Sequence, residues 1–212
     1  IVKITKEKLS IPMTVGGGIK DLFTARRLIM QGADRIAINS AFFEKKGFIK
    51  KIIKDLGEST IVFSIDVSKI NQVYYCFKNN GRENTGITLD EYLEEIKKNG
   101  KSEILITNID NDGLCKGIDF NLVNKLVNYP NPIVYSGGVS SVSDINKLFL
   151  NLKNNSNGVS IGRAFHNFIS SKNNDIKDNN HAFASKFEYI SYKGNQFEKS
   201  LSPDKIYKSF RN

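Results

Sequence analysis

Cysteine is scarce in this sequence, and long apolar runs are absent. The 212 residues include only Cys76 and Cys115, and neither belongs to a spacing that is typical of metal ligands. This scarcity excludes a disulfide scaffold and predicts free thiols in a reducing compartment, which favours a cytoplasmic location. No apolar run reaches the roughly 18 residues that a membrane-spanning helix needs. The first ten residues are charged and have no apolar core like that of a secretory signal.

Acidic residues are too few to balance the basic ones. The chain has 22 Asp and Glu against 31 Lys and Arg, which gives a net charge of +9. A nucleic-acid-binding surface usually contains a dense basic run with interleaved aromatic residues, and none stands out here. A positive charge also suits a protein that binds a multiply phosphorylated metabolite. We therefore expect a phosphorylated small-molecule substrate, and neither a nucleic acid nor a membrane as partner.

Two glycine-containing stretches occur at equivalent points of the pattern, at residues 15–19 (VGGGI) and 136–139 (SGGV). Each follows an apolar run and precedes a helical pattern. A strand, a glycine turn and a helix start bring unpaired backbone N–H groups to the positive end of a helix dipole, where they can bind phosphate. The alternative is a pair of tight turns in which glycine only permits a positive φ. The repetition favours two phosphate sites, one for each end of a ligand.

Apolar runs alternate with helical patterns along the chain. Strands are expected at residues 11–15, 35–40, 60–66, 103–109, 132–135 and 158–161, and helices at 1–10, 20–31, 42–56, 89–98, 120–127 and 145–152. Residues 73–77 are expected to form half of a short hairpin, followed by a polar loop at 81–86. Continuous apolar strands predict a parallel sheet covered by helices. Polar and glycine residues at several strand ends favour a (β/α) barrel over a doubly wound sheet, which usually has one dominant glycine loop.

Six motifs share one order and spacing with a known family: IPMTVGGGIKD (11–21), ADRIAINSA (33–41), VFSID (62–66), NNGRENTGI (79–87), EILITNIDNDGLCKGID (103–119) and YSGGVSSV (135–142). They resemble the HisF family, the cyclase subunits of imidazole glycerol phosphate synthase in histidine biosynthesis. The resemblance implies an α/β fold, a (β/α)8 TIM-type barrel, over residues 1–169, with a divergent tail at 170–212. It implies a lyase without cofactor or metal that takes ammonia from a glutaminase partner. The implied reaction converts a bis-phosphorylated phosphoribulosyl aminoimidazole carboxamide ribotide to imidazole glycerol phosphate and aminoimidazole carboxamide ribotide.

The resemblance also assigns roles to single residues. Asp66, at the end of its predicted strand, matches the family's general acid or base, for which a desolvated carboxylate has a suitable pKa. A cap for the following turn is the alternative. Asp112 matches an acidic position of the family, although it also suits an Asp-Gly turn. The remaining matches are to one phosphate site (Gly18, Asn39, Ser40), the other phosphate site (Gly113, Ser136, Gly137, Gly162) and the charged ring through which ammonia enters the barrel (Arg35, Glu103). A plain surface ion pair is the alternative for Arg35 and Glu103.

The chain also departs from the family. The family's first two βα units, one of which carries a second catalytic aspartate, have no counterpart here. We therefore expect a barrel that lacks its N-terminal quarter and is inactive as given, since six strands cannot close an eight-stranded barrel. Arg163 stands where the family usually has a small residue, and it either clamps phosphate or faces solvent. His166 is expected to be structural.

Two other functions remain open. Arg163 and the divergent tail favour a HisF-like subunit that delivers ammonia for amidination of a surface-polysaccharide sugar. A non-catalytic barrel that serves only as a scaffold for a glutaminase is the third possibility.

Overall fold

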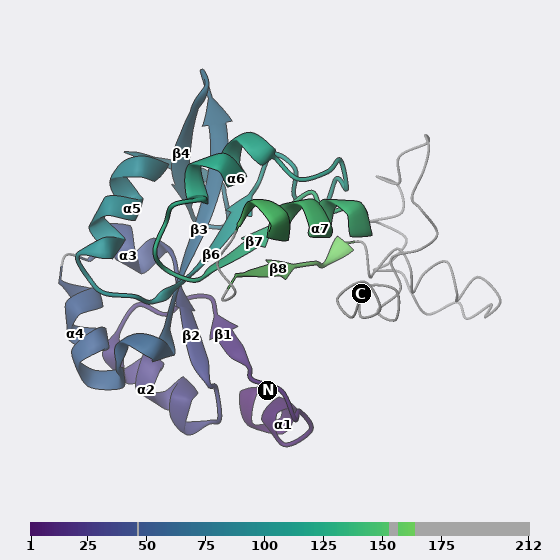
Figure 1. The fold of residues 1–212 in the computed structure, drawn as a ribbon. Helices are drawn as coiled ribbons and strands as arrows, with labels where there is room; N and C mark the ends of the chain where they lie inside the picture. The colour runs from purple at the N-terminus through teal and green to yellow at the C-terminus, as the bar shows by residue number, and fades with distance from the viewer. Residues whose placement is uncertain (46, 153–156, 164–212) are drawn as a thin grey trace.

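The computed structural model describes residues 1–45, 47–152 and 157–163, so His166 and the tail at 170–212 lie outside the described residues. Its centre is a curled sheet in which the parallel strands follow one another in chain order (Figure 1). In this order the strands are β1 (Thr14–Gly16), β2 (Arg35–Ile38), β3 (Ile61–Ile70), β6 (Glu103–Asn108), β7 (Ile133–Ser136) and β8 (Gly158–Ser160). Each is paired in parallel with the next. The predicted parallel sheet is confirmed.

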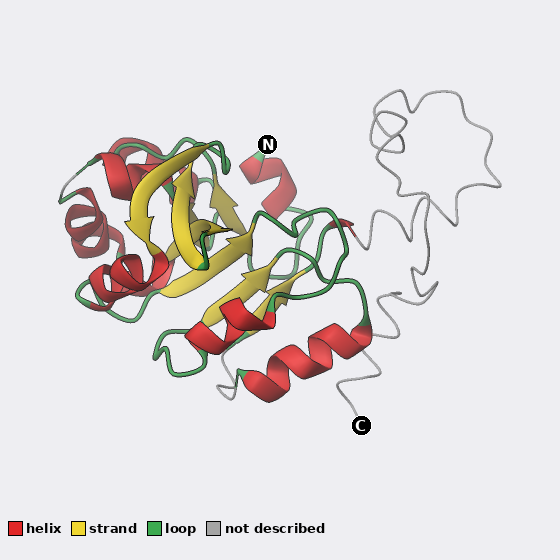
Figure 2. Ribbon diagram, turned by 90° about the horizontal axis from the view of Figure 1, so that it is seen from above, coloured by secondary structure: helices red, strands yellow, loops and turns green. Residues whose placement is uncertain are grey.

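Helices cover the outer side of this sheet, as Figures 1 and 2 show. They are α2 (Leu22–Met30), α3 (Ser40–Glu44), α4 (Phe48–Leu56), α5 (Leu89–Lys97), α6 (Phe120–Leu126) and α7 (Val142–Asn151), with a 3-10 turn at Glu58–Thr60. The short helix α1 (Val2–Lys6) precedes the first strand and has no buried residue. Right-handed crossovers between strands in unbroken chain order place the helices of these crossovers on one face, whereas a doubly wound sheet reverses its order. The arrangement therefore fits a TIM-type fold. None of the helices in the described ranges has the length and apolar character that a membrane span requires.

The core lies between the strands and their helices. Ile61, Val62 and Phe63 are buried one after another at the start of β3, as expected for a strand that is covered on both faces. Ile52 of α4 and Ile96 of α5 are fully buried against the same cluster. This packing holds the strand ends, and the side chains that follow them, in fixed positions.

An antiparallel arm replaces the loop that we predicted at residues 81–86. β4 (Val73–Lys78) pairs with the second half of β3, and β5 (Glu83–Thr88) pairs with β4. The prediction of a loop is wrong because the pairing partner, not the weakly patterned sequence ENTGIT, makes this segment a strand. The third strand likewise extends to Ile70, four residues beyond the predicted end, because β4 supplies its hydrogen-bonding partner.

Two predicted helices are shorter than expected. The helix predicted at 42–56 is divided into α3 and α4, and Gly47 between them has a left-handed φ of 76°. The helix predicted at 1–10 is limited to Val2–Lys6, and its apolar positions do not form a buried face: Ile4 is 62% exposed. The helical patterns were real, but they did not mark where each helix ends.

Candidate functional site

The carboxyl ends of β1 and β2 and the middle of β3 surround a cavity of about 720 Å³. Its lining includes four residues that the sequence suggested for the site: Gly18, Asn39, Ser40 and Asp66. Gly17 and Gly18 take positive φ values of 101° and 66°, which turn their backbone toward the space beyond β1. The cavity lies where barrels of this type place their chemistry.

Asp66 lies in the middle of β3, between Thr107 of β6 and Phe77 of β4. The interpretation of this residue as a turn cap is therefore wrong. One of its carboxylate oxygens accepts a hydrogen bond from Asn39 Nδ2 at 2.9 Å. Burial raises the pKa of the Asp66 carboxyl above its usual value, and the negative charge of Asp112 raises it further, while hydrogen bonds from Asn39 and the Gly81 backbone lower it in part. A carboxyl with a raised pKa can exchange a proton near neutrality.

A second, smaller cavity lies at the carboxyl ends of β7 and β8. It is lined by the other predicted group of anion-binding residues: Gly113, Ser136, Gly137, Gly162 and Arg163. Gly137 has a φ of 103° and closes β7. Arg163 lies close to Cys115: burial raises the pKa of the Cys115 thiol, and the positive charge of Arg163 lowers it. The structure thus brings together residues from three segments that are far apart in the sequence.

Asp112 lines this second cavity, in the loop that follows β6. Its charge also acts on Asp66, so the two carboxylates share one electrostatic environment. Gly113 has a φ of 70°, as the Asp-Gly turn requires. Asp112 therefore has both the local conformation of a turn residue and a position beside the site.

The source of the anion-binding N–H groups differs from the prediction in part. The first amides of α2 and α7 are not all unpaired, because a side chain at the start of each helix accepts a hydrogen bond from one of them. Asp21 accepts a hydrogen bond from Thr24 N at 2.7 Å, and the Ser141 hydroxyl accepts one from Asp144 N at 3.1 Å. The prediction of unpaired helix termini is wrong for these amides. The glycine turns themselves lie beside the cavities: Gly17 and Gly18 line the large one and Gly137 lines the smaller one.

At the opposite ends of the strands, Arg35 and Glu103 form an ion pair, with Nη1 and Oε2 separated by 2.9 Å. Arg35 begins β2 and Glu103 begins β6, and β3 lies between these two strands. A contact between alternate strands is the geometry of one inward-facing layer of a barrel. The pair is half-exposed, at 42% for Arg35 and 23% for Glu103, so it lies at the entrance of that layer.

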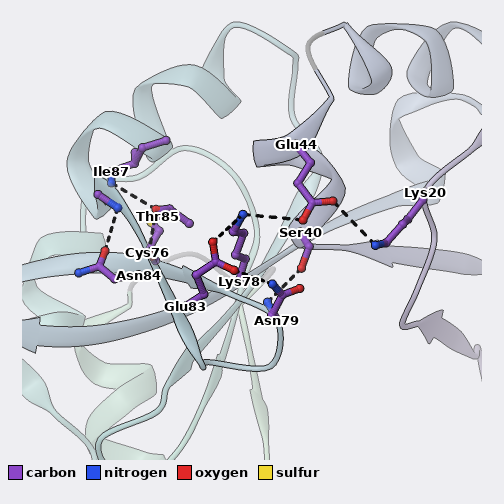
Figure 3. Close-up of polar contacts among 11 residues, drawn as sticks. Lys20, Ser40, Glu44, Cys76, Lys78, Asn79, Glu83, Asn84, Thr85 and Ile87 are labelled. Atoms are coloured by element: carbon purple, nitrogen blue, oxygen red, sulfur yellow. Dashed lines mark hydrogen bonds and ion pairs between the residues drawn. The ribbon is translucent and has the colours of Figure 1, made fainter.

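Sequence reasoning missed the tip of the β4–β5 arm. Asn79, Asn80 and Arg82 line the large cavity together with Lys20, which follows the first glycine turn. Figure 3 shows Asn79 beside Ser40, whose hydroxyl accepts a hydrogen bond from Asn79 N at 3.1 Å. Asn79 and Asn80 have positive φ values of 55° and 59°. The Asn-Asn-Gly signal was present in the sequence but pointed only to a turn.

The described ranges hold no group of three His, Cys, Asp or Glu side chains that could bind a metal ion.

Comparison with known proteins agrees with this geometry. The family profile described as "Histidine biosynthesis protein" matches residues 1–169. The imidazole glycerol phosphate synthase subunit HisF of Natranaerobius thermophilus is 35% identical over 188 residues, which cover 84% of this chain and 74% of that relative. The subunits of the same name from Sulfolobus acidocaldarius and Lactococcus lactis subsp. cremoris are 40% and 39% identical, over 68% and 75% of this chain.

The matches cover only part of these relatives. The chain spans 58% of the length of the Sulfolobus protein and 62% of the Lactococcus protein. Even so, the profile matches far more than half of the chain, and the residues around both cavities lie within the matched range. The chain belongs to the histidine biosynthesis protein family and, within it, to the HisF proteins.

Proposed function

We propose that this chain carries the cyclase site of imidazole glycerol phosphate synthase, an ammonia-dependent lyase of histidine biosynthesis in the cytoplasm. The substrate is phosphoribulosyl aminoimidazole carboxamide ribotide, and the products are imidazole glycerol phosphate and aminoimidazole carboxamide ribotide. The observation that carries the proposal is Asp66, a carboxyl with a raised pKa in a cavity whose wall includes a glycine turn. The family and the names of its relatives support it.

Two anion sites hold the two phosphate ends of this substrate. Gly18, Asn39 and Ser40 form the first site at the large cavity. The second site consists of Gly113, Ser136, Gly137, Gly162 and Arg163. Backbone N–H groups in a left-handed turn form a concavity that binds anions, and the Arg163 guanidinium adds two donors in a planar fork. Binding at both ends places the middle of the substrate near the two carboxylates.

Asp66 acts as the general acid or base in this arrangement, and Asp112 supports it. Asn39 fixes the orientation of the Asp66 carboxylate through its hydrogen bond. Positioned proton transfer of this kind accelerates a reaction by about 10²–10⁴-fold. Burial by the surrounding strands raises the pKa of the Asp66 carboxyl above its usual value, in the direction that a general acid or base needs.

The sheet corresponds to strands three to eight of an eight-stranded barrel. In the described residues, β1 and β8 are the two ends of the parallel path and do not pair with each other. Two further βα units would close the barrel between them. The unpaired edges of β1 and β8 support this assignment.

The face at the amino ends of the strands binds a glutaminase subunit, with Arg35 and Glu103 at the entry for ammonia. Their ion pair spans β3 on the inner side of the sheet, where a path through the barrel would begin. The word "subunit" in the names of the relatives supports an assembly of this kind.

A second candidate is an ammonia-delivering subunit in the amidination of a surface-polysaccharide sugar. Arg163 in the second cavity favours it, because the HisF family usually has a small residue at this position. Turnover separates the candidates. With ammonium salts and the ribotide substrate, the natural full-length protein should release both products of the cyclase reaction. Substrate binding without product would favour the polysaccharide subunit, and the absence of both would favour a scaffold for the glutaminase.

Loss of the Arg35 side chain should affect turnover on glutamine-derived ammonia more than turnover on ammonia from added salts. In Arg35→Ala we expect glutamine-dependent turnover with the glutaminase subunit to fall more than turnover on added ammonium salts, since only the first uses the entry. The free energy of unfolding should change by no more than about 1 kcal/mol, because the ion pair is half-exposed.

Lys98→Ala is the matched control for this variant, because Lys98 forms an exposed ion pair with Glu95 on α5, away from the entry. It should leave the ratio of the two rates unchanged. An equal loss of both rates in Arg35→Ala would contradict a role at the entry.

A further inference from the structure

Four charged side chains form a series of ion pairs between the first glycine turn and the β4–β5 arm, and one of them, Lys20, also lines the large cavity. Lys20 follows the glycine turn, and its Nζ lies 3.9 Å from Glu44. Lys78 lies 3.8 Å from Glu44 and 2.9 Å from Glu83. Figure 3 shows these four residues as a chain of alternating charges that joins the glycine turn to the arm. Both lysines thus already have carboxylate partners.

Arg82 lines the large cavity but does not take part in these ion pairs. None of the ion pairs among the described residues includes its guanidinium. Its side chain is exposed at the cavity wall, where Gly17, Gly18 and Ser40 also lie. Arg82 is therefore the cation of this wall whose hydrogen-bond donors remain available to a ligand.

The turn that carries Arg82 is held in place on both sides. Asn79 N donates to the Ser40 hydroxyl at 3.1 Å, and Asn79 Nδ2 donates to Glu83 at 2.8 Å. Arg82 N donates to the Lys78 carbonyl at 3.2 Å. Residues 79–81 all have left-handed φ values, which close the turn tightly against α3. Because the turn is already fixed, binding must order only the Arg82 side chain and not the backbone that carries it.

We propose that Arg82 binds the phosphate group that the first glycine turn holds. This inference rests on the proposed phosphate site at Gly18, Asn39 and Ser40, and it adds a side chain from the arm. The guanidinium presents two parallel N–H donors that match the oxygens of a phosphate, while Gly17 and Gly18, which line the same cavity, present backbone N–H groups. The arm is thereby a part of the binding site: it selects ligands with a dianionic group at this end of the cavity.

The test is a titration of the chain with inorganic phosphate, followed by the amide NMR signals of Gly17 and Gly18 for the first site and of Gly137 for the second. In Arg82→Gln the dissociation constant from the first site should rise about tenfold, since a charge-assisted bidentate contact is lost. In Arg82→Lys the rise should be smaller, because the charge stays and the fork is lost. The signal of Gly137 should titrate as in the unchanged protein, which also shows that the variants are folded.

Arg27→Gln is the matched control, because it removes the same charge from the exposed side of α2, where Arg27 lies 6.0 Å above the ring of Phe23. It should leave the affinity within about twofold, since long-range effects of one surface charge are screened by salt. If Gly17 and Gly18 respond to phosphate equally in Arg82→Gln and in the unchanged protein, the role of Arg82 is wrong and the phosphate site stands. If these glycines do not respond in the unchanged protein, both the site and the role of Arg82 are overturned.

Discussion

Replacement of Asp66 by asparagine should lower the ammonia-dependent turnover of the natural full-length protein by about 100-fold or more, the scale of general acid–base catalysis. The amide cannot take or give the proton, but its carbonyl oxygen can still accept the hydrogen bond from Asn39. The Michaelis constant should therefore change much less than kcat. The measurement is steady-state turnover with ammonium salts at several pH values.

The same substitution should raise stability while it removes activity. In the folded chain the pKa of Asp66 lies above its ordinary value of 3.8, so folding favours the protonated carboxyl. As pH rises from the unfolded pKa through the folded pKa, the unfolded state gains from ionisation and this carboxyl costs stability. A neutral amide at this position has no such cost. At pH 7 the melting temperature of Asp66→Asn should exceed that of the unchanged chain, and the difference should shrink as pH falls toward 4.

Asp90→Asn is the control for both measurements, because Asp90 is an exposed carboxylate of α5 that pairs with Lys125. It should change neither turnover nor the direction of the pH dependence. Turnover near the normal rate in Asp66→Asn would contradict a role for Asp66 in the chemistry. A lower melting temperature at neutral pH would show that the hydrogen bonds to the Asp66 carboxylate outweigh the cost of its burial.

Replacement of Gly138 by alanine should destabilise the chain by about 3 kcal/mol or more, because two costs coincide. The residue has a φ of 82°, which an L side chain rarely adopts. A Cβ atom would also collide with the carbonyl oxygen of Gly117 and lie 2.9 Å from Asn111 Cβ. The same backbone contact includes the hydrogen bond from Gly117 N to the Gly138 carbonyl, at 2.8 Å. Relief of the collision must move the second glycine turn, so phosphate binding at that turn should be lost as well.

Gly47→Ala separates the two costs. Gly47 has a similar φ of 76°, but a Cβ atom there would meet nothing within 4 Å. This variant should lose only about 1 kcal/mol, the typical cost of a left-handed alanine. Thermal or urea unfolding measures both variants. Equal losses would mean that the chain moves freely around Gly138, and the close approach of Gly117 would then not explain why glycine occupies this position.

The order of the parallel strands and their turns could be read from the sequence, because the patterns that indicate them are local. A buried parallel strand needs a continuous apolar run, and the six runs became the six parallel strands in the same order. Glycine turns after β1 and β7 were equally visible, since a positive φ favours glycine wherever the chain must turn sharply. The motifs also suggested Asp66 and the members of the two proposed anion sites, but through their family resemblance and not through any physical pattern.

Pairings between distant segments depended on the tertiary structure. β5 is a strand because β4 lies beside it, and β3 extends to Ile70 for the same reason; neither strand has a clear apolar pattern of its own there. The ion pair of Arg35 and Glu103 requires two strands that are separated by a third, and the rise in the pKa of Asp66 requires the charge of Asp112 from another loop as well as burial.

Arg82 illustrates this division most clearly. Its sequence, Asn-Asn-Gly-Arg, indicates only a turn, and turns can point in any direction. The bond from Asn79 to Ser40 fixes the turn against α3 and so places Arg82 at the cavity. The sequence by itself determined the strands, the turns and the side chains that are able to take part in binding or catalysis. The tertiary structure decided which of those residues meet, because a contact across a sheet is set by curvature and register, and these arise only when all strands pack together.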